Sequence, residues 1–407
     1  MSDKPLPTDL ELTALDPIFR EHPHDRLDWL RTEDPVYLEA ALGRLFLTRF
    51  EDMRAVLADR SLSRDPRKAP DTPRRRALMG DMPPEAFEPS MLSLDDPDHK
   101  RLRGLVSQAF NQRSVDSWRP RIRAIAEALL DALTDRGSFD VIAEFAAPLP
   151  IIVIAEMLGV DPADMPQCKR WSDARAQIFN PVRSPEQTVE LRAAGQGLND
   201  YFARAIDTRH GRCGDDLISM LVAAEETGNR LSAREIIVTC NLLLIAGNLT
   251  TTDLIGNGVL ALLRHPDQLA KLCAHPELMP NAVEEMLRYD PPVVQTGRFP
   301  LEPREIAGRK VHAGQTMTCS LLAAGHDPAR HSNPHDFDIE RADTTHLAFG
   351  GGAHYCLGAP LARAEAQIAI ATLFERFPRL RLVPQHAVEH KRAPSFNGLE
   401  ALWVHAV

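Results

Sequence analysis

The residue with the clearest chemistry in this sequence is Cys356, which lies in a glycine-rich loop just before a helix-like run over residues 357–377. A cysteine at a helix N-terminus meets free backbone N–H groups and the positive end of the helix dipole. Both favour the thiolate, the form of cysteine that binds a metal. Four glycines without Cβ bulk let the backbone approach a large flat partner: Gly350, Gly351, Gly352 and Gly358. A single thiolate beneath a flat cofactor indicates an axial ligand to haem iron.

Taken alone, the loop is also compatible with two simpler roles. Most cysteines in soluble proteins are small buried hydrophobic residues without a binding role. A glycine-rich loop before a helix can also bind phosphate, although the Gly-Lys-Ser/Thr sequence of that motif is absent here.

The spacing of residues around the cysteine resembles a known signature. Phe349, Gly352, Cys356 and Gly358 form the pattern F-x-x-G-x-x-x-C-x-G, which resembles the haem-binding signature of the cytochromes P-450. Residues 357–363, with the sequence LGAPLAR, resemble the bacterial members. The resemblance implies that Cys356 is the proximal thiolate of haem b. It also implies the cytochrome P-450 fold, mainly α with a minor β part, with the haem between a long central helix and the helix that follows the cysteine loop.

A second motif precedes the cysteine loop. Glu285 and Arg288 are three residues apart on a predicted helix, so their side chains share a face and can form an ion pair. Such a pair is usually a surface feature. Its position matches the E-x-x-R motif of the family, and Arg341 matches the arginine that completes a buried triad. The resemblance implies a structural network that holds the cysteine loop.

Haem carries two propionates, which need cationic partners. His99 and Arg103 are four residues apart, so both project from one face of a predicted helix. Arg298 and His354 follow later, and all four match the positions that bind propionates in the family. Each is singly more typical of an ordinary surface base.

Residues 246–251, with the sequence AGNLTT, lie midway along a long predicted helix. Gly247 costs roughly 1 kcal/mol there relative to alanine, so some gain should offset it. Thr250 can bond the carbonyl of Ala246 and distort the helix, which would open a notch for dioxygen and a water. Packing of Gly247 against a neighbouring helix is the alternative. The resemblance favours the notch, because A-G-x-acid-T forms the oxygen-activation groove of the family.

The sequence departs from that pattern at one position. Leu249 stands where the family has an acid before the threonine, and the nearest carboxylate is Asp253. Proton delivery therefore needs another route, through Thr250 with water, Thr251 or Asp253. The departure leaves haem binding intact and puts standard oxygenation in question.

The substrate pocket is predicted only coarsely. Candidate lining residues lie on the long helix near Thr250, after the Glu285 helix, and in the C-terminal loop: Leu242, Ile245, Ala246, Val293, Val294 and Phe396. Each has ordinary core packing as its alternative, and for Leu242 core packing is favoured.

The elements that position these residues follow from local signals. Residues 36–50 have strand character around Gly43, and residues 120–136 form an amphipathic helix closed by Gly137. Ser232 and Glu235 form a capping box that opens a helix running to His265 before Pro266. A shorter helix covers 281–289, and short strands are predicted over 298–318 and from 380 onward.

The chain is predicted to be one domain over residues 1–407. A β-containing N-terminal part covers about residues 1–60, and a helical haem-binding body covers about residues 90–377. Residues 61–90 form an irregular segment, interpreted as a lid, a binding loop or a solvated loop. The arginines within residues 64–76 hint faintly at an anionic substrate.

Composition restricts the partners and the location. The 407 residues include 47 basic and 57 acidic side chains, a net charge of −10, which disfavours nucleic acid. Six scattered cysteines without a C-x-x-C pair or zinc spacing indicate a reducing cytoplasm. The charged N-terminus resembles neither a signal peptide nor an anchor, and the apolar stretch 146–158 contains two prolines and a glutamate. We expect a soluble cytoplasmic monomer with no membrane segment.

These observations predict a haem-thiolate monooxygenase that hydroxylates a small apolar organic substrate with dioxygen. No flavin or nicotinamide domain fits in the remaining sequence, so electrons should come from a separate ferredoxin and its reductase. Lys100, Arg113 and Arg363 are candidates for a basic docking patch, with solvated charges as the alternative. A peroxide-driven peroxygenase or isomerase, motivated by Leu249, and a non-catalytic haem-based ligand sensor remain the rival predictions.

Overall fold

A single long helix, α11 (Ala233–Arg264), runs through the centre of the molecule. A computed structural model describes residues 11–40, 42–69, 89–179, 183–212, 214–226 and 231–406. At the start of α11, the Ser232 hydroxyl accepts from the Glu235 N–H at 3.2 Å, and the Glu235 carboxylate accepts from the Ser232 N–H at 2.9 Å. His265 ends the helix, and Pro266 begins the next one, so the predicted limits of this helix are confirmed.

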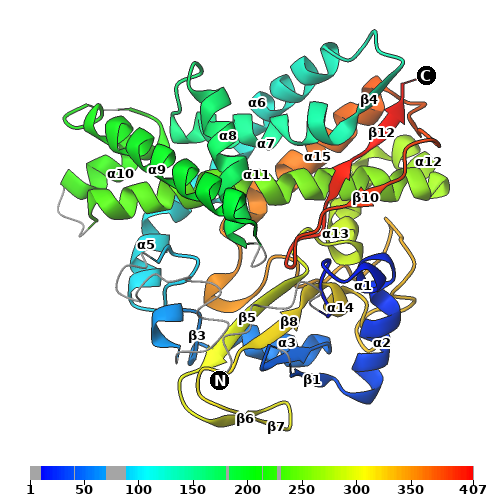
Figure 1. Ribbon diagram of the computed structural model, residues 1–407. Helices are drawn as coiled ribbons and strands as arrows, with labels where there is room; N and C mark the ends of the chain where they lie inside the picture. The colour runs from blue at the N-terminus through cyan, green and yellow to red at the C-terminus, as the bar shows by residue number, and fades with distance from the viewer. Residues whose placement is uncertain are drawn as a thin grey trace.

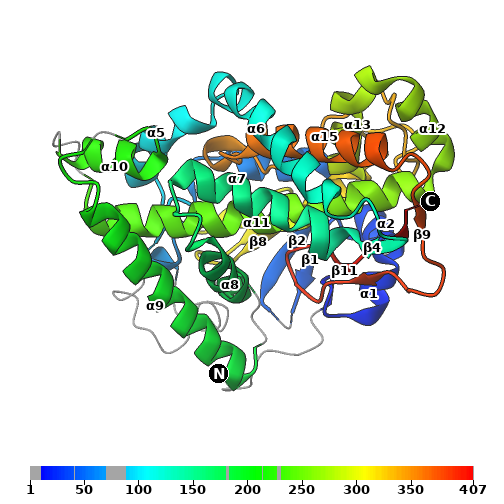
Figure 2. The ribbon, with the colours of Figure 1, turned by 90° about the horizontal axis from the view of Figure 1, so that it is seen from above.

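Most other helices surround α11. Figures 1 and 2 show it crossing the molecule, with α7 and α15 on one side and α8 and α9 on the other. The helices of this body are α5 (Asp98–Val106), α6 (Gln112–Asp131), α7 (Pro148–Leu158), α8 (Met165–Ala176), α9 (Pro185–Asp207), α10 (Leu217–Glu226), α12 (Pro266–Ala274), α13 (Met279–Tyr289) and α15 (Ala359–Arg376). Short turns of other helix types join them: η3 (Ser107–Phe110), η4 (Ile142–Ala146), η5 (Gln177–Phe179), η6 (Pro276–Leu278) and η7 (Gly352–His354).

The main sheet lies at one end of the body and has the strand order β1-β2-β8-β5-β3. Its strands are β1 (Val36–Glu39), β2 (Arg44–Leu47), β3 (Leu62–Ser63), β5 (Gln295–Pro300) and β8 (Met317–Ser320). Only the β2–β8 pair is parallel among these neighbours. The predicted strands around Gly43 are confirmed, and this glycine has φ +61 in the turn between β1 and β2.

Four short helical elements accompany the sheet: α1 (Pro17–Glu21), α2 (Pro23–Glu33), α3 (Phe50–Ala58) and α14 (Leu321–Gly325). The turn η1 (Pro66–Lys68) follows β3. Because strands from residues 36–63 pair with strands from residues 295–320, the N-terminal β part predicted over residues 1–60 is not a separate unit. One apolar cluster confirms this, since Leu45 and Met53 pack there with Met317.

Smaller sheets complete the β part, as predicted for the segments 298–318 and 380 onward. One has the order β4 (Ser138–Asp140), β12 (Trp403–His405) and β9 (Arg381–Leu382). The others are the pairs β6 (Arg304–Ile306) with β7 (Arg309–Val311), and β10 (Glu389–His390) with β11 (Leu399–Ala401).

The predicted limits of the helix at 120–136 are wrong at both ends. Helix α6 starts at Gln112, where the Asn111 side chain accepts from the Ser114 N–H at 2.9 Å, and it ends at Asp131. Pro120 lies inside this helix. A proline lacks the N–H that an interior helical residue donates, so it resembles a helix start in sequence. The capping signal of Asn111 was the better guide.

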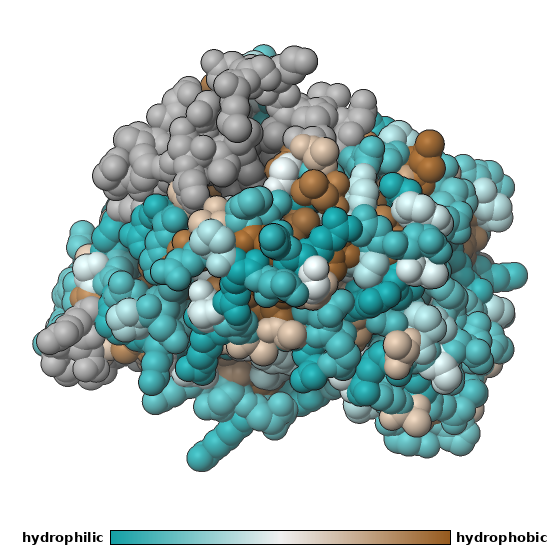
Figure 3. Space-filling model, turned by 90° about the horizontal axis from the view of Figure 1, so that it is seen from below, coloured by the Kyte–Doolittle hydropathy of each residue, from teal (hydrophilic) through white to brown (hydrophobic). Residues whose placement is uncertain are grey.

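The irregular segment predicted over residues 61–90 lies partly outside the described residues, and so do the arginines at 74–76. The face of the molecule seen in Figure 3 is mainly hydrophilic, with apolar side chains gathered near its centre. Among the described residues, α11 is the helix long and apolar enough to cross a membrane by composition. However, 56 % of its most apolar window is buried within the protein, where it forms the core.

Candidate active site

The cysteine loop closes on itself through backbone hydrogen bonds. The Cys356 N–H donates to the Phe349 carbonyl at 2.9 Å, and the Tyr355 N–H donates to the Gly352 carbonyl at 3.2 Å. Gly350 and Gly352 have φ +71 and +64, which other residues rarely adopt. The loop thus holds Cys356 two residues before Gly358, the N-cap of α15.

The glycines of this loop do not all serve the purpose predicted for them. A Cβ on Gly352 would lie 2.2 Å from the Leu57 carbonyl oxygen, and one on Gly351 would lie 3.1 Å from Leu57 Cβ. Leu57 belongs to α3, so these two glycines allow the loop to pack on a helix, not on a flat partner. A Cβ on Gly358 would lie 4.0 Å from Cys356 Sγ, so this glycine keeps the space beside the sulfur open.

The surroundings of Cys356 decide whether its sulfur can bind a partner. The side chain is exposed, yet protein atoms surround it so closely that burial raises the pKa of its thiol. The N–H groups of Gly358 and Ala359 and the charges of Arg103 and Arg363 oppose this shift. The predicted thiolate-stabilising groups are therefore present, but burial outweighs them in the protein alone. A bound metal cation would supply the missing compensation.

Arg363 and Glu284 hold Phe349, the aromatic residue of the cysteine loop. The Arg363 guanidinium lies 4.6 Å above the Phe349 ring and donates to Glu284 at 2.6 and 2.8 Å. Glu284 also pairs with His346 at 3.2 Å. Burial by itself would raise the pKa of the Glu284 carboxyl, but these partners lower it to about 2.

The ion pair of Arg363 with Glu284 changes the expectation that Arg363 belongs to a basic docking patch. Arg363 is committed to Glu284, while Lys100 and Arg113 are exposed, on α5 and α6. Sequence reasoning missed Glu284 and His346, because their contacts join α13, the cysteine loop and α15.

The E-x-x-R motif forms a fully buried charge network. The Glu285 carboxylate accepts from Arg288 at 2.6 and 2.8 Å and from Arg341 at 3.1 Å. Arg288 also donates to the carbonyls of Gly325, Pro334 and Asp336 at 2.6 to 3.0 Å. The structure thus brings together all three residues of the predicted triad. Its charges and donors are satisfied within the protein, as a buried ion pair requires.

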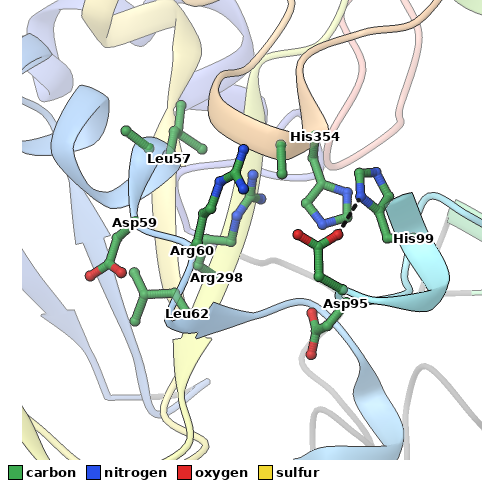
Figure 4. A pocket seen from close by; sticks show the side chains of 11 residues that line it. Leu57, Asp59, Arg60, Leu62, Asp95, His99, Arg298 and His354 are labelled. Carbon is green, nitrogen blue, oxygen red and sulfur yellow. Dashed lines mark hydrogen bonds and ion pairs between the residues drawn. The ribbon is translucent and has the colours of Figure 1, made fainter. Parts of the chain in front are cut away.

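A second charged cluster lies at the other side of the cysteine loop. It contains the four predicted propionate partners and one more arginine: His99, Arg103, Arg298, His354 and Arg64. The His99 and His354 rings are 4.2 Å apart, and Figure 4 shows His354, His99 and Arg298 around one pocket. Burial lowers the pKa of His354 to about 2, and the charges of Arg64 and Arg298 add to this shift. The members of this cluster are all basic groups, and a positive charge on one disfavours a positive charge on its neighbours.

The described residues offer this cluster little negative charge. Asp95 is the carboxylate beside it, and its oxygens already accept from Lys68 at 2.7 Å, Ser63 at 2.6 Å and the Arg64 N–H at 3.0 Å. Asp96 lies 3.4 Å from His99 Nδ1. Arg298 is buried, and its hydrogen bond within the described chain goes to the adjacent Gly297 carbonyl. The cluster therefore fits a ligand with more than one anionic group.

Arg64 is the member that sequence reasoning assigned differently, as a faint hint of an anionic substrate. Burial lowers the pKa of its guanidinium to about 9, with a contribution from Arg298. Its neighbours in space come from α5, β5 and the cysteine loop, so no local pattern could have joined it to them.

The central helix leaves one small residue uncovered. Ala246 is exposed, although the residues on either side of it along α11 are largely buried. The Thr250 hydroxyl donates to the Ala246 carbonyl at 3.0 Å, as predicted. The helix remains continuous, so the predicted distortion is not found. A Cβ on Gly247 would lie 3.2 Å from Ile154 of α7, which favours the packing role of this glycine over the notch.

The two alternative proton carriers point to different neighbours. Asp253 is buried and pairs with Lys391 at 2.7 Å, and burial raises the pKa of its carboxyl to about 6. A Cβ on Gly398 would lie 2.0 Å from its Oδ1 oxygen. Asp253 therefore faces the C-terminal segment, and among the described residues no hydrogen bond joins it to Thr250.

Thr251 leads to a residue that sequence reasoning missed. Its side chain hydrogen-bonds with Glu365 of α15, whose carboxyl is fully enclosed. Burial raises the pKa of Glu365 well above its ordinary value, and its Oε1 atom has no partner within the described residues. Glu365 therefore lies beside α11 as a buried carboxyl with a raised pKa.

The pocket candidates divide into two groups. Val293 forms a bridge with Phe396, so the segment after α13 and the C-terminal loop meet. Ile245 is buried, and Leu242 packs on the main core, as favoured for it. Val294 is partly buried and packs on the N-terminal cluster of Leu12, Leu27 and Phe46, and its assignment to the pocket stays a prediction.

Comparisons with known proteins agree with this geometry. The family described as Cytochrome P450 matches residues 84–399. The cytochrome P450 monooxygenase PikC of Streptomyces venezuelae is 40 % identical over 405 residues, which cover 97 % of this chain and 94 % of the relative. The 6-deoxyerythronolide B hydroxylase of Saccharopolyspora erythraea is 37 % identical over 390 residues, with 92 % and 95 % covered.

Solved structures give the same result for the fold. The crystal structure of CalO2 superposes with a TM-score of 0.89 at 33 % identity, covering 98 % of this chain and 99 % of that one. P450BioI, solved with an acyl carrier protein bearing hexadec-9Z-enoic acid, has a TM-score of 0.87 at 36 % identity, with 96 % and 100 % covered. The chain therefore belongs to the cytochrome P450 family. Like its named relatives, it is a monooxygenase, and the family implies a haem cofactor.

The residues of this chain fit such a group. The exposed sulfur of Cys356 lies near Arg103, a member of the cationic cluster, and that cluster is short of anions. An exposed alanine, Ala246, lies on the central helix. Cys356 would hold the iron, and the cluster of Arg64, His99, Arg103, Arg298 and His354 would hold the propionates.

Proposed function

We propose that this protein hydroxylates a small apolar organic substrate, using dioxygen and electrons from a separate ferredoxin and its reductase. The observation that carries the proposal is the exposed Cys356 sulfur beside the cationic cluster, together with the exposed Ala246 and the partly exposed Thr250 on the central helix. When bound, haem b supplies the reductive activation of dioxygen at its iron.

The residues of the chain have separate tasks in this proposal. Cys356 provides the sulfur ligand, and the cysteine loop fixes its position through the Phe349 carbonyl and the N–H groups of Gly358 and Ala359. The guanidinium and imidazole groups of the cationic cluster orient the propionates. The triad around Glu285 holds the segment that leads into the loop.

Thr250 would position a water molecule and pass its proton. Its hydroxyl proton is committed to the Ala246 carbonyl at 3.0 Å, which leaves the oxygen lone pairs free to accept from water. Leu249 cannot supply a proton, and Asp253 is committed to Lys391. Glu365, whose pKa is raised by burial and whose carboxyl is bonded to Thr251, is the proton source that we propose in place of the missing acid.

The substrate is proposed to be apolar because the pocket candidates are aliphatic or aromatic. Relatives bind ligands of this kind: CYP267B1 was solved with myristic acid, and CYP109E1 with testosterone. A protein acting in the cytoplasm as a soluble monomer agrees with the acidic composition and the scattered cysteines.

Turnover with heavy-oxygen-labelled dioxygen tests this function. A substrate found by screening for a haem spin-state change should gain one labelled hydroxyl oxygen when a ferredoxin and its reductase are supplied. Label appearing only in water, or no product from any compound that binds, would refute the proposal.

Thr250→Ala sharpens the test, with Thr252→Ala as the matched control. Both hydroxyls donate to a carbonyl four residues back at 3.0 Å, but Thr252 is buried and Thr250 is partly open. We expect Thr250→Ala to raise the peroxide released per electron consumed several-fold and Thr252→Ala to leave it unchanged. Equal coupling in both variants would remove Thr250 from the mechanism.

A peroxide-driven enzyme is the second candidate, and Leu249 is the observation that favours it. Turnover with hydrogen peroxide alone, faster than with the electron-donor proteins, would establish it in place of the first proposal.

A further inference from the structure

Three histidines meet at a place that the oxygenase chemistry does not use. His24 lies in the first turn of α2, His326 is the C-cap of α14, and His335 lies in the loop that leads to Arg341. The ring of His24 is 4.1 Å from that of His326 and 5.2 Å from that of His335, and the latter two rings are 5.2 Å apart. One nitrogen from each residue lies within 4.8 Å of the other two.

Two imidazole nitrogens of this group, His24 Nδ1 and His326 Nε2, are buried and lack a hydrogen-bond partner among the described residues. His326 Nδ1 lies 3.1 Å from the Leu322 carbonyl, so its proton belongs on Nδ1 and its lone pair on Nε2. A buried lone pair without a partner costs free energy. Something other than the surrounding protein would have to satisfy it.

The third histidine has a partner that prepares it for binding a metal. His335 Nε2 lies 2.9 Å from the Asp28 carboxylate, which leaves Nδ1 free to face the other two rings. A carboxylate that accepts from one imidazole nitrogen while the other binds a metal is the usual arrangement around zinc.

Charges around the cluster do not oppose a cation. The acidic groups nearest His24 are Asp28 and Asp25, and the basic group is Arg31, which pairs with Asp28 at 2.5 Å. The basic group nearest His326 is Arg288, whose charge is paired with Glu285.

We propose that His24, His326 and His335 bind one divalent transition-metal ion, with Zn²⁺ as the best match. Three imidazole ligands suit zinc, nickel and copper, and zinc accepts four tetrahedral ligands. His335 is exposed, so solvent water can provide the fourth ligand. Zinc–nitrogen bonds of about 2.0–2.1 Å place ligand nitrogens about 3.4 Å apart, so the rings close in by about 1 Å on binding.

The site would fasten α2 to the loop that the buried triad also holds. The residues just before two of the ligands, Gly325 and Pro334, give their carbonyls to Arg288 at 2.6 and 2.8 Å. The metal would therefore hold the segments at Gly325 and Pro334, which Arg288 also holds, and would join helix α2 to them. It is a structural site, separate from the haem pocket, and its existence does not depend on the substrate of the enzyme.

Zinc content of the purified holoprotein tests the proposal. After dialysis against Zn²⁺ and removal of free metal, elemental analysis should find one zinc per haem iron. The thermal unfolding midpoint should rise with Zn²⁺ and fall back after a chelator is added. A parent protein that retains no zinc and shows no shift would overturn the site.

His335→Gln and His24→Gln are the variants, and His275→Gln is the matched control. His275 is also exposed and also lies beside a carboxylate, Glu277, at 3.1 Å. The two site variants should lose the zinc and the shift, whereas the control should keep both. Zinc retained at parental stoichiometry by either folded site variant would refute the assignment. A reduced carbon-monoxide spectrum like that of the parent shows that a variant is folded.

Discussion

Two buried groups of charge flank the cysteine loop, and they differ in how they are compensated. The triad of Glu285, Arg288 and Arg341 has its carboxylate and its guanidinium groups bonded to one another and to loop carbonyls. The cationic cluster of Arg64, His99, Arg103, Arg298 and His354 holds five basic groups together, and the two carboxylates beside it are Asp96, which contacts His99, and Asp95, which is already bonded to Lys68.

The difference separates a structural network from a binding site. A charge network satisfied by the protein alone contributes to folding, and removing one member leaves a buried charge. A cluster left uncompensated is destabilising until a ligand of opposite charge arrives. The same residue type, arginine, therefore has opposite roles on the two sides of Cys356.

Arg288→Ala should have the largest effect. It leaves three carbonyls without their donor and removes one of the two arginines that pair with Glu285, so we expect a loss of about 3–5 kcal/mol of folding stability. Thermal unfolding and the yield of folded protein measure it. Arg330→Ala is the control, because Arg330 pairs with Asp343 at the surface and should cost less than about 1 kcal/mol. Equal losses of folding stability in Arg288→Ala and Arg330→Ala would show that the buried network contributes no more than a surface ion pair.

Arg298→Ala should weaken haem retention without unfolding the protein. A hydrogen bond to a charged group contributes about 1.5–3 kcal/mol, so haem should transfer to an acceptor protein at least about tenfold more readily. Folding stability measured without haem should stay the same or rise, because one of the like charges is gone. A stability loss as large as that of Arg288→Ala would show that Arg298 belongs to the structural network.

Arg64→Ala should have a similar but smaller effect on haem retention, since Arg103, Arg298 and the two histidines of the cluster remain as propionate partners. Arg67→Ala is the matched control, because the Arg67 guanidinium is bonded to Asp65 and lies outside the cluster. The same transfer assay compares them. If haem loss is unchanged in Arg64→Ala, then Arg64 is not a propionate partner, and its proposed link to the cluster fails.

The smallest effect should be a pH dependence. The pKa of His354 is about 2 in the folded protein without an anion, against about 6.5 when unfolded. The unfolded chain therefore takes up the proton first, and stability without haem should fall as the pH drops from neutral to about 5. Haem propionates would offset the depressed pKa of His354. The folding stability of the haem-loaded protein, measured by urea unfolding at several pH values, should therefore change less with pH. Identical slopes in both forms would count against the cluster as the propionate site.

Local signals were enough to predict the central helix and the strands around Gly43. The capping box of Ser232 and Glu235 and the stop at Pro266 each depend on a few neighbouring residues. The Thr250 bond to Ala246 followed from helix geometry alone. The start of α6 was missed because Pro120 resembles a first helical residue, although Asn111 is the true cap.

Contacts between distant segments account for the remaining errors. The roles of Gly351 and Gly352 depend on Leu57 of α3, and the role of Gly247 depends on Ile154 of α7. Glu365 acts on α11 only because α15 packs against it. Arg64 and the three histidines at 24, 326 and 335 come together only in the fold, so no spacing along the chain could indicate them.

The reduced, carbon-monoxide-treated absorption spectrum tests whether Cys356 binds the haem iron. The parent protein should show the red-shifted band typical of sulfur-ligated haem, and Cys356→Ala should lose it, whether or not haem is retained. A band that persists in Cys356→Ala, or that is never seen in the parent, would contradict the assignment of Cys356 as the sulfur ligand of the haem iron.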